Sequence, residues 1–174
     1  MTISNNTTTL KVPHFKIHEA SGRYMARRSL TDLQIIKAAK AILANKLNRV
    51  DVFEDACVAK DYLITHFSNR EHEVFSCLFL DNQHRLIAFE ELFRGTIDGA
   101  NVYPREVVKR ALQLNAAAVI FAHNHPSGFT EPSQADKSIT SRLQHALGVV
   151  DIGVLDHIIV GGGSAYSFSK HGLI

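Results

Sequence analysis

Two histidines and a carboxylate lie close together in the second half of this chain and could hold a metal ion. They are His123, His125 and Asp136. Imidazole nitrogens and carboxylate oxygens are common ligands of catalytic zinc, which binds three protein side chains and leaves the fourth tetrahedral position to water. A structural zinc would favour cysteine, but Cys57 and Cys77 are single and distant from this segment. The residue types therefore predict an open, catalytic zinc site.

The segment before the histidines indicates how they are positioned. Residues 116–122 form a continuous apolar run of strand length, so the histidines are expected at the end of a buried strand. Because side chains alternate along a strand, His123 and His125 would point to one face and Asn124 to the other. Two imidazoles on one face can converge on a single ion, about 2.0–2.1 Å from each nitrogen.

A helix is expected to begin at Ser133, three residues before Asp136. Apolar residues recur along it at four-residue steps, at Ala135, Ile139, Leu143 and Leu147. Gly148 follows as a C-terminal stop. A serine with an acid three residues later also suits a helix start for its own capping, so taken alone this pair indicates a capping box. Beside the histidines, the second interpretation is that a tight loop rich in proline and glycine brings Asp136 to the metal as third ligand.

Hydrophobic periodicity divides the rest of the chain into helices and strands. Helices are expected over residues 32–46, 54–67 and 104–114, and strands over residues 74–80, 86–92, 155–160 and 165–168. The glycine run at 161–163 indicates the hairpin turn between the last two strands. Residues 1–28 are rich in Thr, Asn and Ser without a sustained period, which is typical of a flexible or only locally ordered segment. This order predicts an α/β protein, an α-β-α sandwich around a curved mixed sheet.

Length and composition limit the classes of protein to consider. With 174 residues, 45% of them hydrophobic, the chain suits one domain with a full core and an N-terminal extension. A formal charge of +2 is too small to indicate nucleic-acid binding by itself. No stretch approaches the roughly 18 apolar residues of a membrane span, and residues 1–9 lack the basic and apolar regions of a signal peptide. We therefore expect a cytoplasmic protein without a membrane partner.

Three segments closely resemble the RadC-like proteins, a bacterial branch of the JAMM (MPN-plus) metalloprotease superfamily. They are residues 104–112 (PREVVKRAL), 122–128 (AHNHPSG) and 155–161 (LDHIIVG). The resemblance extends over residues 73–174 and implies a JAB/MPN-like, cytidine-deaminase-like domain over residues 71–174. Residues 29–70 would then form an N-terminal helical extension behind the flexible segment. The resemblance also implies a metallopeptidase-type site for a peptide or protein substrate.

The same resemblance implies a role for each residue of the site. Zn²⁺ would be held by His123, His125 and Asp136. Ser133 would help to stabilise the oxyanion, and a glutamate near the start of an early strand would act as general base. Glu73 stands directly before the strand predicted over residues 74–80 and is the best-placed of four candidates, which are Glu71, Glu73, Glu90 and Glu91. In the alternative interpretation Glu71 and Glu73 are solvated flanks of an edge strand.

Three further residues have two interpretations each. His157 is expected to be structural or to support a ligand rather than to bind the metal, because three ligands are already present. Arg105 belongs either to a solvated first helical turn or to the wall of a substrate cleft. Ser127 either only shapes the loop beside the metal or also contacts the substrate.

These features predict a zinc-dependent hydrolase that cleaves an amide or isopeptide bond. A zinc-dependent nuclease or DNA-repair-associated factor is one alternative. It would need a second metal about 3.5–4 Å from the first or a basic track for phosphates, and the sequence offers Arg23, Arg27, Arg28 and scattered lysines. A non-catalytic interaction module of the MPN type is the other alternative, although such modules lose the ligands that this chain retains.

Overall fold

A five-stranded mixed sheet forms the centre of the computed structural model, which describes residues 12–18, 21, 23–47, 56–95 and 101–174. The strand order is β4-β3-β5-β6-β7. The strands are β3 (Val74–Leu80), β4 (Leu86–Arg94), β5 (Ala118–Asn124), β6 (Gly153–Gly161) and β7 (Ser164–Ser167). Strands β5 and β6 run parallel and every other neighbouring pair runs antiparallel, so the sheet is mixed as predicted.

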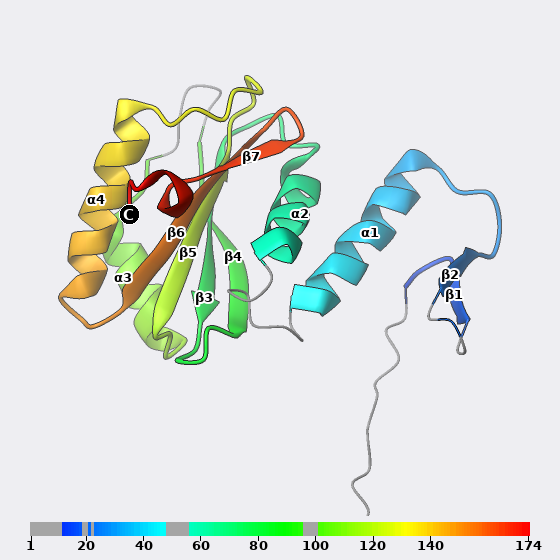
Figure 1. Cartoon of the computed structure of the whole chain (residues 1–174), viewed down its shortest axis with the longest axis horizontal. Helices are drawn as coiled ribbons and strands as arrows, with labels where there is room; N and C mark the ends of the chain where they lie inside the picture. Colours follow the sequence, from blue (N-terminus) through cyan, green and yellow to red (C-terminus); the bar gives the residue numbers. More distant parts are fainter. Residues whose placement is uncertain (1–11, 19–20, 22, 48–55, 96–100) are drawn as a thin grey trace, which may run out of the picture.

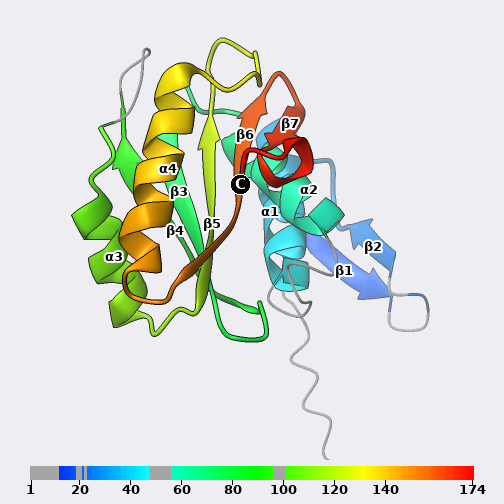
Figure 2. The same cartoon turned by 60° about the vertical axis from the view of Figure 1, so that its left-hand side comes forward.

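Helices cover both faces of this sheet. Helix α2 (Ala56–Phe67) lies on one face, and α3 (Pro104–Gln113) and α4 (Gln134–Gly148) lie on the other (Figure 1, Figure 2). This arrangement confirms the predicted α-β-α sandwich. None of the described helices is both long and apolar enough to cross a lipid bilayer.

The alternation of side chains along the strands supplies both halves of the core. On β3, Phe75, Cys77 and Phe79 pack toward α3 and α4, whereas Leu78 and Leu80 pack toward α2. All seven residues of β3 and all seven of β5 are buried. Because the two central strands are covered on both faces, they have the continuous apolar runs from which they were predicted.

Helix α2 belongs to the core of the sheet. Its residues Ala59, Tyr62, Leu63 and Phe67 form one hydrophobic cluster with the strands. The predicted boundary at residue 71 therefore separates two segments that share a core, because the apolar face of α2 is buried in one cluster with residues of β3, β5 and β6 rather than against the preceding helix alone. The predicted division of the chain into three parts otherwise stays a prediction.

The described residues before α2 form a helix and a hairpin. Helix α1 (Asp32–Leu47) contacts α2, and Lys40 Nζ donates a hydrogen bond to the His66 carbonyl at 3.0 Å. Strands β1 (Phe15–His18) and β2 (Arg23–Ala26) pair antiparallel beyond α1 (Figure 1). Residues 1–11 of the segment predicted to be flexible lie outside the described residues, as do residues 54 and 55 at the predicted start of the second helix.

Turn residues explain where some element boundaries differ from the prediction. Strand β5 begins at Ala118 rather than at residue 116, because Asn115 adopts a left-handed φ of 55° and the Ala116 amide still donates to the Ala111 carbonyl. Helix α4 ends at Gly148 as predicted, but the left-handed residue that turns the chain toward β6 is Asp151, with φ 58°.

The turn between β6 and β7 consists of Gly162 and Gly163, as predicted. Both have positive φ, 54° and 78°. A two-residue hairpin turn with positive φ at both positions matches the right-handed twist of its strands, and glycine adopts it without strain.

Candidate metal centre

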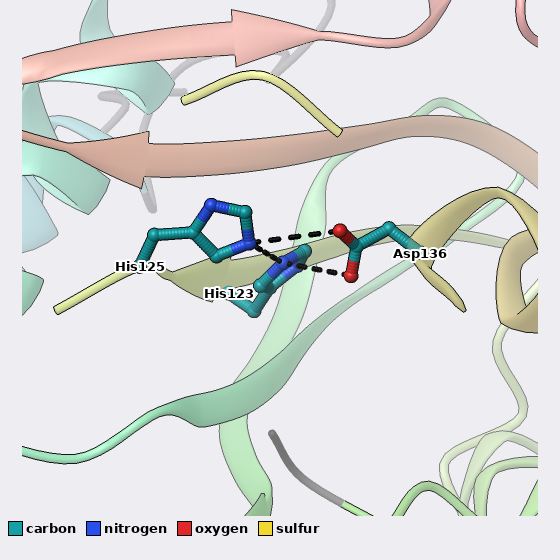
Figure 3. A group of neighbouring side chains, drawn as sticks. All are labelled: His123, His125 and Asp136. Atoms are coloured by element: carbon teal, nitrogen blue, oxygen red, sulfur yellow. Dashed lines mark hydrogen bonds and ion pairs between the residues drawn. The ribbon is translucent and has the colours of Figure 1, made fainter. Parts of the chain in front are cut away.

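The end of β5 places both histidines on the same side of the sheet. His123 lies within β5 and is 1% exposed. His125 follows the strand, and its amide continues the ladder by donating to the Val160 carbonyl at 2.8 Å. Asn124 points to the opposite face, where its Oδ1 accepts from the Val74 amide at 2.9 Å and its Nδ2 donates to the His72 carbonyl at 3.0 Å. The predicted alternation is confirmed, and both imidazoles face the first turn of α4 (Figure 3).

The first turn of α4 orients Asp136 through a capping box. Ser133 is the N-cap, and its Oγ accepts from the Asp136 amide at 3.1 Å. Asp136 Oδ2 in turn accepts from the Ser133 amide at 2.7 Å and from the Ser133 hydroxyl at 2.6 Å. Because Oδ2 holds the helix start, Oδ1 is left to face His123. The capping interpretation and the ligand interpretation of this pair are therefore compatible in one geometry.

The three side chains have the spacing that a tetrahedral zinc site needs. The Nε2 atoms of His123 and His125 are 3.0 Å apart, and His123 Nε2 is 3.2 Å from Asp136 Oδ1. His125 Nε2 is 3.6 Å from the other carboxylate oxygen, Asp136 Oδ2, and one ligand atom from each of the three residues lies within 4.8 Å of the others. Zinc bonds of about 2.0–2.1 Å at tetrahedral angles place neighbouring ligand atoms about 3.3–3.4 Å apart. The donor set and its spacing fit a zinc ion, so this group of residues could hold a metal.

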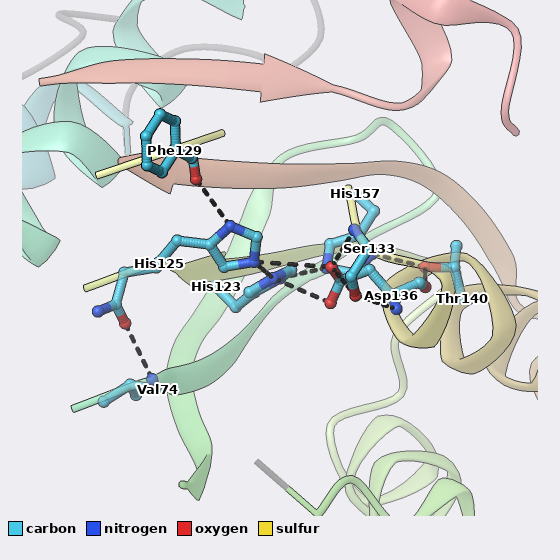
Figure 4. Close-up of polar contacts among 9 residues, drawn as sticks. Val74, His123, His125, Phe129, Ser133, Asp136, Thr140 and His157 are labelled. Carbon is cyan, nitrogen blue, oxygen red and sulfur yellow. Dashed lines mark hydrogen bonds and ion pairs between the residues drawn. The ribbon is translucent and has the colours of Figure 1, made fainter. Parts of the chain in front are cut away.

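Each histidine also uses its second ring nitrogen. His123 Nδ1 lies 2.8 Å from Nε2 of His157, and His157 Nδ1 lies 2.6 Å from the Thr140 hydroxyl (Figure 4). His125 Nδ1 lies 2.7 Å from the Phe129 carbonyl. In metal sites such contacts set the ring orientation and the protonated nitrogen of the ligand. His157 therefore contacts a candidate ligand through its ring and is not itself a member of the group that could hold a metal, in line with the expectation for this residue.

The loop that carries the Phe129 carbonyl packs against the β6–β7 turn. A Cβ atom at Gly161 would lie 2.8 Å from the Gly128 carbonyl oxygen, and one at Gly162 would lie 2.9 Å from it. Such distances leave no room for a side chain at either position. The loop, and with it the Phe129 carbonyl that His125 contacts, therefore lies directly against the end of β6.

The charges of the site favour an added positive charge. Burial alone would raise the pKa of Asp136, but hydrogen bonds from His123, His125 and Ser133 outweigh it and hold this pKa far below its ordinary value. The contact with Asp136 raises the pKa of His125 against the opposing effect of its partial burial. Asp136 makes no ion pair with Lys or Arg in the described part of the chain. A cation is the partner that this carboxylate and these imidazoles have in common.

A cleft of about 490 Å³ opens beside these ligands. The predicted site residues that line it are Glu73, His125, Ser127, Ser133 and Asp136. His123 is buried and is not among the residues that line the cleft. The arrangement thus leaves room for a substrate next to the metal-binding atoms.

Glu73 is the candidate glutamate that lines this cleft. Glu90 instead accepts a hydrogen bond from Arg110 at 2.7 Å, and Glu91 pairs with His66 and Arg70. Glu71 is exposed and borders a separate depression. The structure therefore places Glu73, and none of the other three candidates, in the lining of this cleft.

Two residues near the site were missed by the sequence analysis. Thr140 lies one helical turn after Asp136, a spacing that could have indicated a shared face. Arg142 lines the cleft, whereas Arg105, the arginine considered for that place, is not among its lining residues. No local pattern distinguishes Arg142 from the other cations of α4, because its position depends on how the helix rotates over the sheet.

Comparison with known proteins identifies the family. A family model described as a RadC-like JAB domain matches residues 53–173. The chain belongs to the RadC-like JAB domain family. The match includes α2, in agreement with the packing of that helix on the sheet of the JAB domain.

Proteins named UPF0758 are similar over most of this RadC-like chain. The protein of Nitrosococcus oceani is 59% identical over 145 residues, which are 83% of this chain and 65% of the relative. The protein of Methylibium petroleiphilum is 56% identical over 140 residues, 80% of this chain and 63% of the relative. The chain thus spans slightly less than two thirds of these two relatives. The protein of Vibrio cholerae is 52% identical over 159 residues, 91% of this chain and 98% of the relative.

Proposed function

We propose that this RadC-like chain is a zinc-dependent hydrolase of the JAMM metallopeptidase type that cleaves an amide or isopeptide bond. The observation that supports this best is the convergence of His123, His125 and Asp136 at a cleft that Glu73 also lines. Zinc held by three protein ligands polarises a carbonyl and lowers the pKa of a coordinated water to about 7. The substrate would be a peptide or protein.

Glu73 would move the proton. Its side chain is half-buried at the cleft and makes no ion pair among the described residues, so its carboxylate is available as an acceptor. As general base it would accept a proton from the attacking water and pass it to the leaving amine. The amine needs this proton because an amide anion is a poor leaving group.

Ser133 would stabilise negative charge on the substrate oxygen. Its hydroxyl now donates to Asp136 Oδ2, and hydroxyl protons rotate to suit a new acceptor. If the proton turns toward the substrate, Asp136 still keeps the hydrogen bond from the Ser133 amide. The ligand carboxylate can therefore stay oriented while the hydroxyl donates to an oxyanion.

Metal analysis together with a peptide-cleavage assay tests the proposal. We expect near-stoichiometric zinc in the purified parent protein and its loss in His123→Ala and Asp136→Ala. Glu73→Gln should keep zinc and lose cleavage of a degenerate peptide library followed by mass spectrometry. A parent protein that binds no zinc when it is supplied, or ligand variants that keep it, would overturn the proposal.

The two alternatives predict different results in the same experiments. Among the residues that the structure describes, only His123, His125 and Asp136 form a group able to hold a metal, so a second metal of the kind that two-metal nucleases use has no ligands there. A nuclease that contacts DNA phosphates would instead bind DNA with an affinity that falls steeply as the salt concentration rises. A non-catalytic module of the MPN type would bind no zinc and cleave nothing, so metal content separates it from the proposed hydrolase.

A further inference from the structure

We propose that Thr140 and His157 are positioning residues that hold His123 with its Nδ1 protonated and its Nε2 lone pair toward the metal. This proposal rests on the proposed function, since it assigns His123 as a zinc ligand. The evidence for it is a series of hydrogen bonds. The series begins at the backbone of one proposed ligand, Asp136, passes through Thr140 and His157, and ends at another, His123 (Figure 4).

The direction of this series follows from its first bond. Thr140 Oγ1 lies 2.6 Å from the Asp136 carbonyl oxygen, one helical turn earlier. A carbonyl can only accept, so the hydroxyl donates its single proton there. The same oxygen lies 2.6 Å from His157 Nδ1 and must accept in that contact. His157 therefore has its proton on Nδ1.

The environment of His157 keeps its other nitrogen as an acceptor. The side chain is 0% exposed, and its ring lies 5.5 Å from that of Phe75, 5.8 Å from that of Phe121 and 4.8 Å from that of Phe168. No carboxylate forms a hydrogen bond with this ring among the described residues, so a charge buried there would have no hydrogen-bonded counter-ion. The neutral ring with a proton on Nδ1 has its lone pair on Nε2.

His123 then donates from Nδ1 to this lone pair, across 2.8 Å. Its own lone pair is left on Nε2, which faces His125 Nε2 at 3.0 Å and Asp136 Oδ1 at 3.2 Å. His125 reaches the same state by another route, because its Nδ1 lies 2.7 Å from the Phe129 carbonyl and must be the donor. Two lone pairs and a carboxylate oxygen thus lie close together, and a cation bound between them would remove their mutual repulsion.

The series of hydrogen bonds makes the orientations of Asp136 and His123 depend on each other. Asp136 fixes Thr140 through its carbonyl, and Thr140 fixes the ring of His123 through His157. All three links are buried, whereas the loop that fixes His125 is at the surface, with Phe129 76% exposed. The turn of α4 that presents one ligand therefore also selects the tautomer of another.

Removing the Thr140 hydroxyl should reverse this selection. In Thr140→Val the shape is nearly conserved, but His157 Nδ1 loses its acceptor and the ring can move its proton to Nε2. His123 would then accept at Nδ1 and carry its own proton on Nε2, where the metal should bind. We expect zinc affinity to fall about 10–100-fold, the range found when groups that orient metal ligands are removed.

Imidazole ¹⁵N NMR of the metal-free protein at mildly alkaline pH tests the tautomer directly. We expect Nδ1–H and a bare Nε2 for His123 in the parent and in Thr140→Ser, and the reverse in Thr140→Val. Zinc affinity, measured by competition with a chelator, should be parent-like in Thr140→Ser. Leu147→Met alters a fully buried residue of α4 two helical turns after Thr140 and outside these hydrogen bonds, so it should change stability but neither readout.

An unchanged His123 tautomer in Thr140→Val would overturn the proposal, as would parent-like zinc affinity in that variant. A merely structural role for Thr140 would lower stability without moving the ¹⁵N signals. If the parent binds no zinc, the proposed function fails, while the NMR comparison still tests the positioning residues by themselves.

Discussion

Two contacts between a histidine and a carboxylate lie on opposite faces of the same sheet. On the α2 face, His66 Nε2 lies 2.7 Å from Glu91 Oε1. On the α4 face, His123 Nε2 lies 3.2 Å from Asp136 Oδ1. The residue types are alike, but only the second pair belongs to a group of described residues that could hold a metal ion.

The difference lies in the other charges around each carboxylate. Glu91 also pairs with the Arg70 guanidinium, and Lys40 stands close enough to affect the pKa of His66. Asp136 meets two imidazoles and the hydroxyl and amide of Ser133. Where the chain supplies its own cation, the pair is a salt bridge. Where it supplies imidazole nitrogens and no Lys or Arg among the described residues, the group is suited to an external cation.

Removing the carboxylate from each pair should give the largest difference in zinc affinity between the two faces of the sheet. Asp136→Asn is expected to reduce zinc affinity by more than the roughly 10–100-fold that loss of an orienting group causes, because a ligand itself is changed. The matched variant Glu91→Gln should bind zinc like the parent, since its face of the sheet is separated from the site by the core. Zinc titration of both variants checks this. Equal losses would show that the two faces are coupled.

Replacing the Glu73 carboxylate at the cleft by a neutral amide should slow turnover and leave zinc binding intact. Glu73→Gln is expected to slow peptide cleavage about 10²–10⁴-fold, the usual contribution of a general base. Glu71→Gln changes an exposed glutamate two residues away and should retain the parent rate. Rates measured at equal zinc occupancy test this. A slow Glu71→Gln with a normal Glu73→Gln would move the general base to the other residue.

Displacing the loop that contacts His125 should have an intermediate effect on zinc affinity. In Gly161→Ala the new Cβ would lie 2.8 Å from the Gly128 carbonyl oxygen, so the loop and the Phe129 carbonyl must shift. We expect zinc affinity to fall about tenfold, the lower end for loss of an orienting contact. Gly148→Ala adds a Cβ with no atom within 4 Å and serves as control. Chelator competition on both variants would contradict this prediction if Gly161→Ala matched the control.

The contact between His66 and Glu91 on the α2 face should affect only the pH dependence of stability. Burial lowers the pKa of His66 below its ordinary value, against the raising effect of Glu91. The unfolded chain then binds a proton more readily than the folded one, so stability falls as the pH drops from about 7 toward 5. His66→Gln should remove part of this fall, by less than about 1 kcal/mol. Denaturant unfolding of metal-free parent and variant measures the difference, and parallel pH profiles would contradict it.

Much of the fold could be predicted because its main signals are local. The strand over residues 74–80 was predicted with its observed bounds, since a buried central strand is a continuous apolar run between polar residues. The placement of α2 was not predictable in this way. Its apolar face indicates that it packs on something, but periodicity does not say whether the partner is α1 or the sheet.

From the sequence alone it was possible to predict which groups could hold a metal ion and how neighbouring members of that set are oriented. Alternation along a strand puts His123 and His125 on one side, and a helix start joins Ser133 to Asp136, because backbone geometry over a few residues is enough for both. That Glu73 lines the cleft, and that His157 contacts the ring of His123 from 34 positions further along the chain, became evident only in the folded protein. Those contacts depend on strand order and on the rotation of α4 over the sheet, which arise from packing of the whole core and have no local signature.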